Sequence, residues 1–116
     1  MSGTALHPKT LASLIRTLAL DKKAEDPIIL DISKLSSMAN YFVLMHGNSD
    51  PHVRAIGEHI LEQLKAKKVR VLHSEGFEEG KWILLDYGAV IAHVFYYQTR
   101  EFYGLERLWG NAKRLP

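Results

Sequence analysis

The sequence predicts an α/β protein, of the mixed α+β kind, with helices flanking a mixed sheet of about five strands. Three observations predict this fold. Two long segments carry apolar residues at helical spacing, and five short apolar runs have the length of strands. The last two runs are separated by only four residues, which is typical of an antiparallel hairpin.

The chain has 116 residues, of which 47% are hydrophobic. This length suits one domain with one core, and the composition is that of a globular protein. We therefore expect a single domain spanning residues 1–116.

The first helix is predicted from Pro8 to about Lys23, because proline is tolerated in a first turn and apolar residues then recur at helical spacing. Asp26-Pro27 is expected to end the helical segment. Residues 28–32 form a nearly continuous apolar run, which predicts a strand covered on both faces. A turn follows, and residues 41–45 predict a second buried strand.

The second helix is predicted to start at Asp50-Pro51, with Asp50 capping free backbone N–H groups. Apolar residues keep the helical period to Leu64, and the lysines that follow lie where the helix dipole favours cations. Residues 69–72 predict a short third strand.

The last part of the chain predicts a hairpin, a short helix and a polar tail. Residues 82–85 and 90–97 are the hairpin strands, and residues 99–108 carry apolar positions at three-residue steps. We expect the tail from residue 110 to be frayed.

Charge and composition exclude several classes of protein. Lys and Arg number 15 against 13 Asp and Glu, a net charge of +2. This balance does not favour a protein that binds through phosphate contacts alone, so no dedicated nucleic-acid site is predicted. The basic clusters are Lys65, Lys67, Lys68 and Arg70, then Lys113 and Arg114.

The chain has no cysteine, which excludes disulfides and thiolate metal sites. Its apolar runs are shorter than the ~20 residues of a membrane helix, and its first eight residues lack the apolar core of a signal peptide. We expect a soluble, cytoplasmic protein with no membrane partner.

Six histidines raise the question of a metal site. His52 and His59 are seven residues apart on the second predicted helix, or ~10 Å along its axis, too far to share one ion readily. The other interpretation is that both flank the apolar stripe at the surface. We predict no metal and no cofactor.

The segment 47–50 precedes a helix, and helix N-termini bind anions. It lacks the Lys-Ser/Thr of a P-loop, and it is similar to the Gly-Ser turn of nucleotidyltransferases. Those enzymes need clustered carboxylates to hold two metal ions, whereas only Asp31 and Asp86 accompany strands here. The acidic loop with Glu75, Glu78 and Glu79 is expected to be solvated. We predict no catalytic residue.

Trp82 opens a predicted strand and shares one side of it with Leu84 and Asp86. An aromatic, an apolar and a charged side chain on one face suit a protein-binding patch. A tryptophan in the core is equally compatible with the spacing, so both interpretations stay open.

Several motifs occur together in a specific order and spacing. They are KLSSMANYFVLMHGNSDPHVRAI at 34–56, Glu75-Gly76, WILLDYGAVIAHVF at 82–95 and REFYGLERLWG at 100–110. In these segments, which cover nearly the whole chain, the sequence resembles the ribosome silencing factor family, also called Iojap-like.

The resemblance implies a nucleotidyltransferase-like fold without enzymatic activity. It implies binding to ribosomal protein fourteen of the large ribosomal subunit, a steric block of subunit joining and repression of translation. Organelle relatives act in large-subunit assembly, and relatives form homodimers. The tryptophan of the W-x-x-x-D stretch, here Trp82, is implicated in docking, with Leu84, Asp86 and His93 as further candidates. The alternatives are a nucleotidyltransferase-like enzyme and a large-subunit assembly factor.

Overall fold

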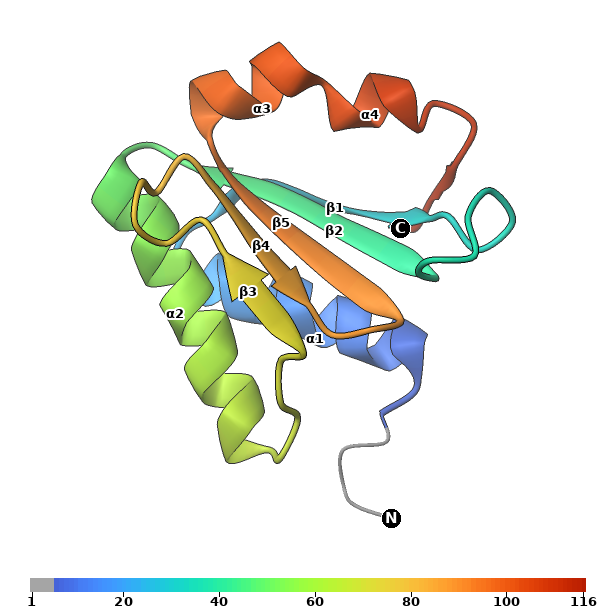
Figure 1. Ribbon diagram of the computed structural model, residues 1–116, viewed down its shortest axis with the longest axis horizontal. Coiled ribbons are helices and arrows are strands. Elements are labelled where there is room, and N and C mark those ends of the chain that lie inside the picture. The colour runs from blue at the N-terminus through green and yellow to red at the C-terminus, as the bar shows by residue number, and fades with distance from the viewer. Residues whose placement is uncertain (1–5) are drawn as a thin grey trace.

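Six strands form one mixed sheet in the computed structural model, which describes residues 6–116 (Figure 1). The strands stand in the order β3-β4-β5-β2-β1-β6, with β2 and β5 parallel and the other neighbours antiparallel. Their bounds are Glu25–Asp31 (β1), Tyr41–Gly47 (β2), His73–Glu75 (β3), Trp82–Asp86 (β4), Val90–Tyr96 (β5) and Lys113–Arg114 (β6). The predicted mixed α/β fold and the β4–β5 hairpin are confirmed.

Helices cover both faces of the sheet (Figure 1). One face packs against α1, Pro8–Asp21, and α2, Asp50–Ala66. We call it the α1/α2 face. The other lies under α3, Tyr97–Tyr103, and α4, Leu105–Leu108. We call it the α3/α4 face.

The central strands are buried on both faces, as predicted for residues 28–32 and 41–45. In β2, Val43 packs on the α1/α2 face, and its neighbour Leu44 packs on the α3/α4 face. The same alternation in β5 places Val94 on the first face and His93 on the second. Each strand therefore serves two apolar layers.

The second helix starts one residue earlier than predicted. Ser49 is the N-cap, and its hydroxyl accepts a hydrogen bond from the His52 amide at 3.2 Å. Asp50 lies inside the first turn, and its carboxylate pairs with the ammonium of Lys81 at 2.9 Å. The prediction of Asp50 as cap was wrong because Ser49 was available to make the same bond one residue upstream.

The first strand starts before Pro27, which was expected to end the helical segment and to precede the strand. β1 begins at Glu25, and its register with β2 shifts between Glu25 and Ile28, where Asp26 has a positive φ of 48°. This irregularity accommodates Pro27, whose ring nitrogen cannot donate to a neighbouring strand.

The third strand lies after the predicted residues 69–72. Val69 is buried at the end of α2 instead, and regular pairing starts at His73, opposite Asp86. All three side chains of β3 are exposed, so this edge strand has no apolar alternation by which the sequence could reveal it.

The C-terminal part differs from the prediction in two ways. Gly104 adopts a left-handed conformation, φ 57°, and divides the expected helix into α3 and α4. The tail is not frayed, because Arg114 pairs with Leu30 and the Leu115 amide donates to the Ile29 carbonyl at 2.9 Å. β6 thus adds a sixth strand at the β1 edge.

Candidate interaction surface

The α3/α4 face brings together the four residues singled out in the sequence. Burial alternates along β4, which places Trp82, Leu84 and Asp86 on this face while Ile83 and Leu85 are buried on the other. His93 lies on the adjacent strand, directly opposite Leu84. The structure therefore supports their common location, and their role in binding stays a prediction.

The Trp82 side chain is half-buried and is held by three neighbours. Its indole N–H donates a hydrogen bond to Nδ1 of His93 at 3.1 Å. Its ring centroid lies 5.0 Å from that of Phe95 and 4.9 Å from that of Tyr103. Trp82 is thus partly a core residue and partly a surface residue, so each of the two sequence interpretations describes one side of its ring.

His93 is buried, with 5% of its surface exposed, and its ring contacts those of Phe42 and Phe95. Burial lowers the pKa of His93 to about 4, so the imidazole is neutral at pH 7. Because Nδ1 accepts the Trp82 bond, the proton resides on Nε2. Nε2 is buried and has no hydrogen-bond partner within residues 6–116.

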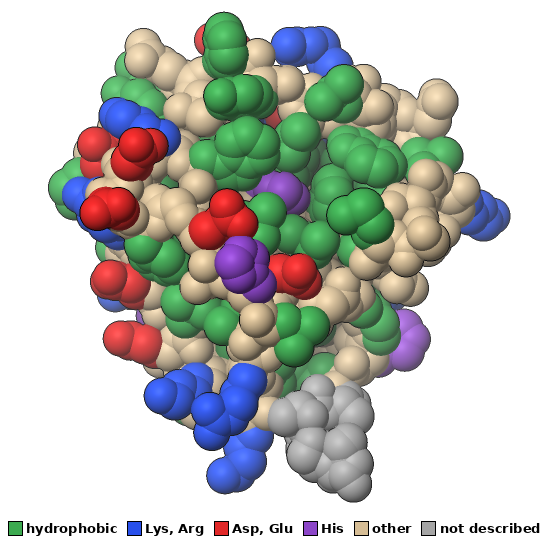
Figure 2. Space-filling model, viewed as in Figure 1, with side chains coloured by type: hydrophobic (Ala, Val, Ile, Leu, Met, Phe, Trp, Pro, Cys, Tyr) green, Lys and Arg blue, Asp and Glu red, His purple; other side chains and the backbone are tan. Residues whose placement is uncertain are grey.

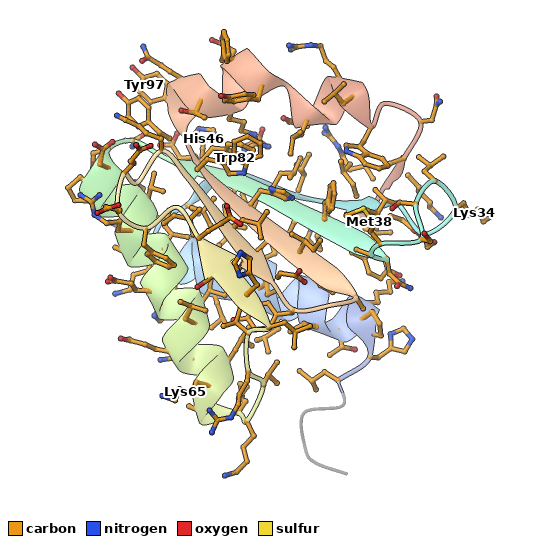
Figure 3. All side chains as sticks on the ribbon, in the orientation of Figure 1. Lys34, Met38, His46, Lys65, Trp82 and Tyr97 are labelled. Carbon is orange, nitrogen blue, oxygen red and sulfur yellow. The ribbon has the colours of Figure 1, made fainter. Side chains whose placement is uncertain are left out.

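Exposed aromatic side chains extend this site onto α3. Phe102 is 78% exposed and Tyr103 50% exposed, and their rings contact each other. Together with Trp82 and Leu84 they form what we call the aromatic surface. Figure 2 shows hydrophobic side chains gathered on this side of the molecule, and Figure 3 shows Trp82 beneath α3.

The sequence reasoning missed Phe102 and Tyr103 as candidates. It predicted one short helix from the three-residue steps of Phe102, Leu105 and Leu108, of which only Leu105 packs against the core. Gly104 separates Phe102 in α3 from Leu105 and Leu108 in α4. A glycine in the middle of a supposed ten-residue helix was the one available signal.

An acidic rim borders the aromatic surface. A shallow hollow is lined by Glu75, Trp82 and Leu84. Glu75 also accepts a hydrogen bond from the His73 ring at 2.7 Å, and Asp86 lies opposite His73 in the β3–β4 ladder. One Asp86 oxygen accepts the Gly88 amide at 2.8 Å. The surface therefore combines aromatic groups with carboxylates.

A buried arginine fixes α3 and α4 to the sheet. Arg100 is 6% exposed, and its guanidinium binds the Glu106 carboxylate at 3.1 Å and Nδ1 of His46 at 2.9 Å. The pairing satisfies a charge that would be costly to bury alone. Since Phe102 and Tyr103 follow Arg100 in the same short helix, this network also positions the aromatic surface. Nothing in the sequence pattern singled out Arg100.

The other candidate sites have different local roles. The His52 ring fills the turn at residues 47–50, where its Nδ1 accepts the Asn48 amide at 3.0 Å and its Nε2 lies 2.8 Å from the Lys22 carbonyl. His59 contacts Asp21 of α1 at 3.2 Å. In the described part of the chain, no three His, Asp or Glu side chains are grouped to hold a metal ion.

The comparisons with known proteins identify the family. The family described as "Ribosomal silencing factor during starvation" (RsfS) matches residues 5–116. The chain is 40% identical over 107 residues to the ribosomal silencing factor RsfS of Bacillus subtilis, covering 92% of this chain and 91% of that protein. The chain belongs to the ribosomal silencing factor family. The family resemblance predicted from the motifs is confirmed.

Solved structures and organelle relatives agree with this membership. A crystal structure from Chromobacterium violaceum matches with a TM-score of 0.88 and 34% identity, covering 90% of this chain and 88% of that one. The chain is also 32% identical to the chloroplastic protein Iojap of Arabidopsis thaliana, covering 84% of this chain and 41% of that protein. A mouse relative, 29% identical, is named mitochondrial assembly of ribosomal large subunit protein 1; it is matched over 92% of this chain and 46% of its own length.

Within residues 6–116, no helix is both long enough and apolar enough to span a membrane.

Proposed function

We propose that this protein binds the large ribosomal subunit through ribosomal protein fourteen, blocks joining of the small subunit and so represses translation in the cytoplasm. Membership of the ribosomal silencing factor family supports the ribosome as the target. The observation that carries the docking site is the half-buried Trp82, held from below by His93 and flanked by the exposed ring of Tyr103.

This arrangement has the properties of an interface centre. Truncating an aromatic residue at the centre of an interface commonly costs ~2–4 kcal/mol, and the rigid ring loses little entropy on binding. Trp82 has no other donor than the N–H already bound to His93, so its open side offers only an apolar surface. Leu84 extends that surface, and Asp86 adds a carboxylate suited to a cationic side chain.

The decisive measurement is co-sedimentation of Trp82→Ala with purified large subunits. We expect an affinity loss of roughly 30- to 1,000-fold. Thermal unfolding should show less destabilisation than a fully buried tryptophan would, since part of the ring is open to solvent. Trp109→Ala is the matched control, because Trp109 packs against Phe42 in the same apolar layer without joining the aromatic surface.

The control should lose stability and keep its affinity. A folded Trp82→Ala protein that binds large subunits like the parent would place the docking site elsewhere on the molecule.

Subunit assembly is the second candidate role, supported by the printed name of the mouse relative. The two roles separate when finished small and large subunits are mixed with this protein before gradient sedimentation. Silencing predicts fewer joined ribosomes, and Trp82→Ala should restore them. Joining that is unaffected by saturating protein would favour the assembly role.

We also propose that the protein is not an enzyme. Asp31 binds the backbone amide and hydroxyl of Ser33, and Asp86 binds the Gly88 amide, so each has a structural role in a turn. Calorimetric titration with ATP or CTP and magnesium should give no heat of binding. A micromolar, magnesium-dependent site near residues 47–50 would overturn this proposal.

We propose a homodimer as well, because Phe102 and Tyr103 leave apolar area exposed that self-association would cover. Because both residues belong to the aromatic surface, the dimer would compete with docking to the large subunit. Light scattering at micromolar concentration should give twice the chain mass of 13.2 kDa. A 13.2 kDa particle at every concentration would exclude the dimer.

A further inference from the structure

We propose that the basic cluster at the end of α2, formed by Lys65, Lys67, Lys68 and Arg70, binds the phosphate backbone of ribosomal RNA while the aromatic surface holds ribosomal protein. This inference rests on the proposed docking to the large subunit, because that docking brings the cluster to an RNA-rich particle. It assigns the cluster a partner that the sequence alone did not favour.

The four cationic side chains are exposed and have no ion pair within residues 6–116. Residues 1–5 contain no acidic side chain. The chain as a whole has 15 basic and 13 acidic side chains, a net charge of +2, so this one cluster gathers more positive charge than the net charge of the chain. Concentrated, unpaired positive charge is the electrostatic property that binds phosphates.

Helix stability accounts for only part of the cluster. Lys65 lies in the last turn of α2, where a cation is favoured by the helix dipole. That effect falls off beyond the last turn, so it does not explain Arg70. Lys68 adopts a left-handed φ of 66°, a conformation that glycine adopts more readily. The helix dipole therefore accounts for Lys65 and gives Arg70 no role in stabilising the helix.

The end of α1 is a natural reference for this argument. It too finishes with a lysine pair, Lys22 and Lys23, and Lys23 has a similar left-handed φ of 61°. Three acidic residues accompany that pair, namely Asp21, Glu25 and Asp26. At the end of α2 the corresponding residues, 66–71, include no Asp or Glu, and the nearest acidic residue of the helix is Glu62, three residues before Lys65. The end of α2 therefore has the larger local excess of basic residues.

The cluster and the aromatic surface are accessible from one side. Figure 2 shows one group of Lys and Arg side chains at the lower end of the view and a group of hydrophobic side chains in its upper part. Figure 3 shows Lys65 at the far end of α2 from Trp82. A large particle can therefore contact both regions together, with protein at one and RNA at the other.

The test compares two charge-matched variants in binding to purified large subunits over a range of salt concentrations. Lys67→Gln/Lys68→Gln removes two charges from the cluster, and Lys22→Gln/Lys23→Gln removes two from the end of α1. If both cluster lysines contact phosphates, raising salt from about 50 to about 200 mM should weaken the parent roughly tenfold more than the cluster variant. The control should follow the parent.

An equal effect in both variants would overturn the proposal, because it would show a general charge effect. A cluster variant with the same salt dependence as the parent would also overturn it. The proposed docking through Trp82 is tested separately in the same assay, where Trp82→Ala should lose its binding to large subunits whatever the outcome for the cluster. Binding of the parent and the cluster variant is also measured to naked ribosomal RNA and to phosphatidylglycerol vesicles. Weaker binding of the cluster variant to RNA supports the proposal, whereas a defect confined to vesicles overturns it in favour of a membrane surface.

Discussion

The two faces of the sheet differ in what they bury and in what they leave open. The α1/α2 face packs a large apolar layer in which Ile15, Ile60 and Ile83 have no exposed surface. The α3/α4 face packs a smaller layer, includes the buried polar side chains His93 and Arg100, and leaves Trp82 partly accessible.

This difference indicates a division of labour. The α1/α2 face, the closed face, supplies most of the hydrophobic stabilisation, since burial of apolar area is the dominant favourable contribution to folding. The α3/α4 face, the open face, uses hydrogen bonds and ion pairs to orient a few side chains at a surface. Such polar networks are directional, so they favour a specific geometry over maximal stability.

The largest expected effect is on the closed face. Ile60→Ala should lower the free energy of unfolding by about 2–5 kcal/mol, because it creates a cavity in a fully packed layer. Phe102→Ala, which truncates a residue that is 78% exposed, should change it by less than about 0.5 kcal/mol. Urea unfolding of both variants measures the contrast. Comparable losses would refute the assignment of stability to the α1/α2 face.

The next effect concerns the pH dependence of stability on the open face. Burial lowers the pKa of His93 from 6.5 to about 4, so the unfolded state binds a proton at a higher pH than the folded state. The stability is therefore full above pH 6.5 and is lost as the pH falls toward 4, by up to roughly 3 kcal/mol.

His93→Phe isolates this contribution, because phenylalanine keeps an aromatic ring and cannot titrate. Between pH 7 and pH 4, the unfolding free energy of the parent should fall by that amount relative to the unfolding free energy of the variant. A constant difference over this range would mean that His93 is not buried in its neutral form.

A smaller effect tests the bond between Trp82 and His93. Trp82→Phe removes the indole donor, His93→Phe removes the acceptor, and the double variant removes both. A double-mutant cycle should give a coupling of about 0.5–1.5 kcal/mol in stability, the usual contribution of one hydrogen bond. If the bond also orients Trp82 for docking, the same cycle will be non-additive in affinity for large subunits.

Much of this fold was predictable because burial repeats with a period. The spacing of apolar residues located α1, α2, β1 and β2, and the short hairpin loop located β4 and β5. Pairing that leaves no apolar alternation was not predictable: the β3 side chains are all exposed, and β6 is a two-residue polar strand held by bonds to β1.

The candidate site was predictable only in part, for a similar reason. The alternation along β4 correctly placed Trp82, Leu84 and Asp86 on one face. The bond from Trp82 to His93 and the contact with Tyr103 join segments that are distant in sequence, so local spacing did not reveal them. The buried Arg100 depends on Glu106 and His46 in the same way.

The smallest effect compares one buried polar atom on each face. The hydroxyl of Tyr87 on the α1/α2 face is buried without a hydrogen-bond partner in the described residues, as is Nε2 of His93 on the other face. Burial also raises the pKa of Tyr87 to about 12, so the phenol stays neutral. An unpaired buried hydroxyl is unfavourable, whereas the ring that carries it packs well.

Tyr87→Phe should therefore leave stability unchanged or raise it by up to about 1 kcal/mol, as measured by thermal unfolding. Tyr103→Phe is the control, since Tyr103 is half exposed and water can solvate its hydroxyl. His93→Phe should instead lower the stability at pH 7, because it removes the acceptor for the Trp82 N–H together with the unpaired N–H of His93. A marked loss of stability in Tyr87→Phe would show that its hydroxyl has a partner, such as an ordered water, and that the closed face contains a polar site of its own.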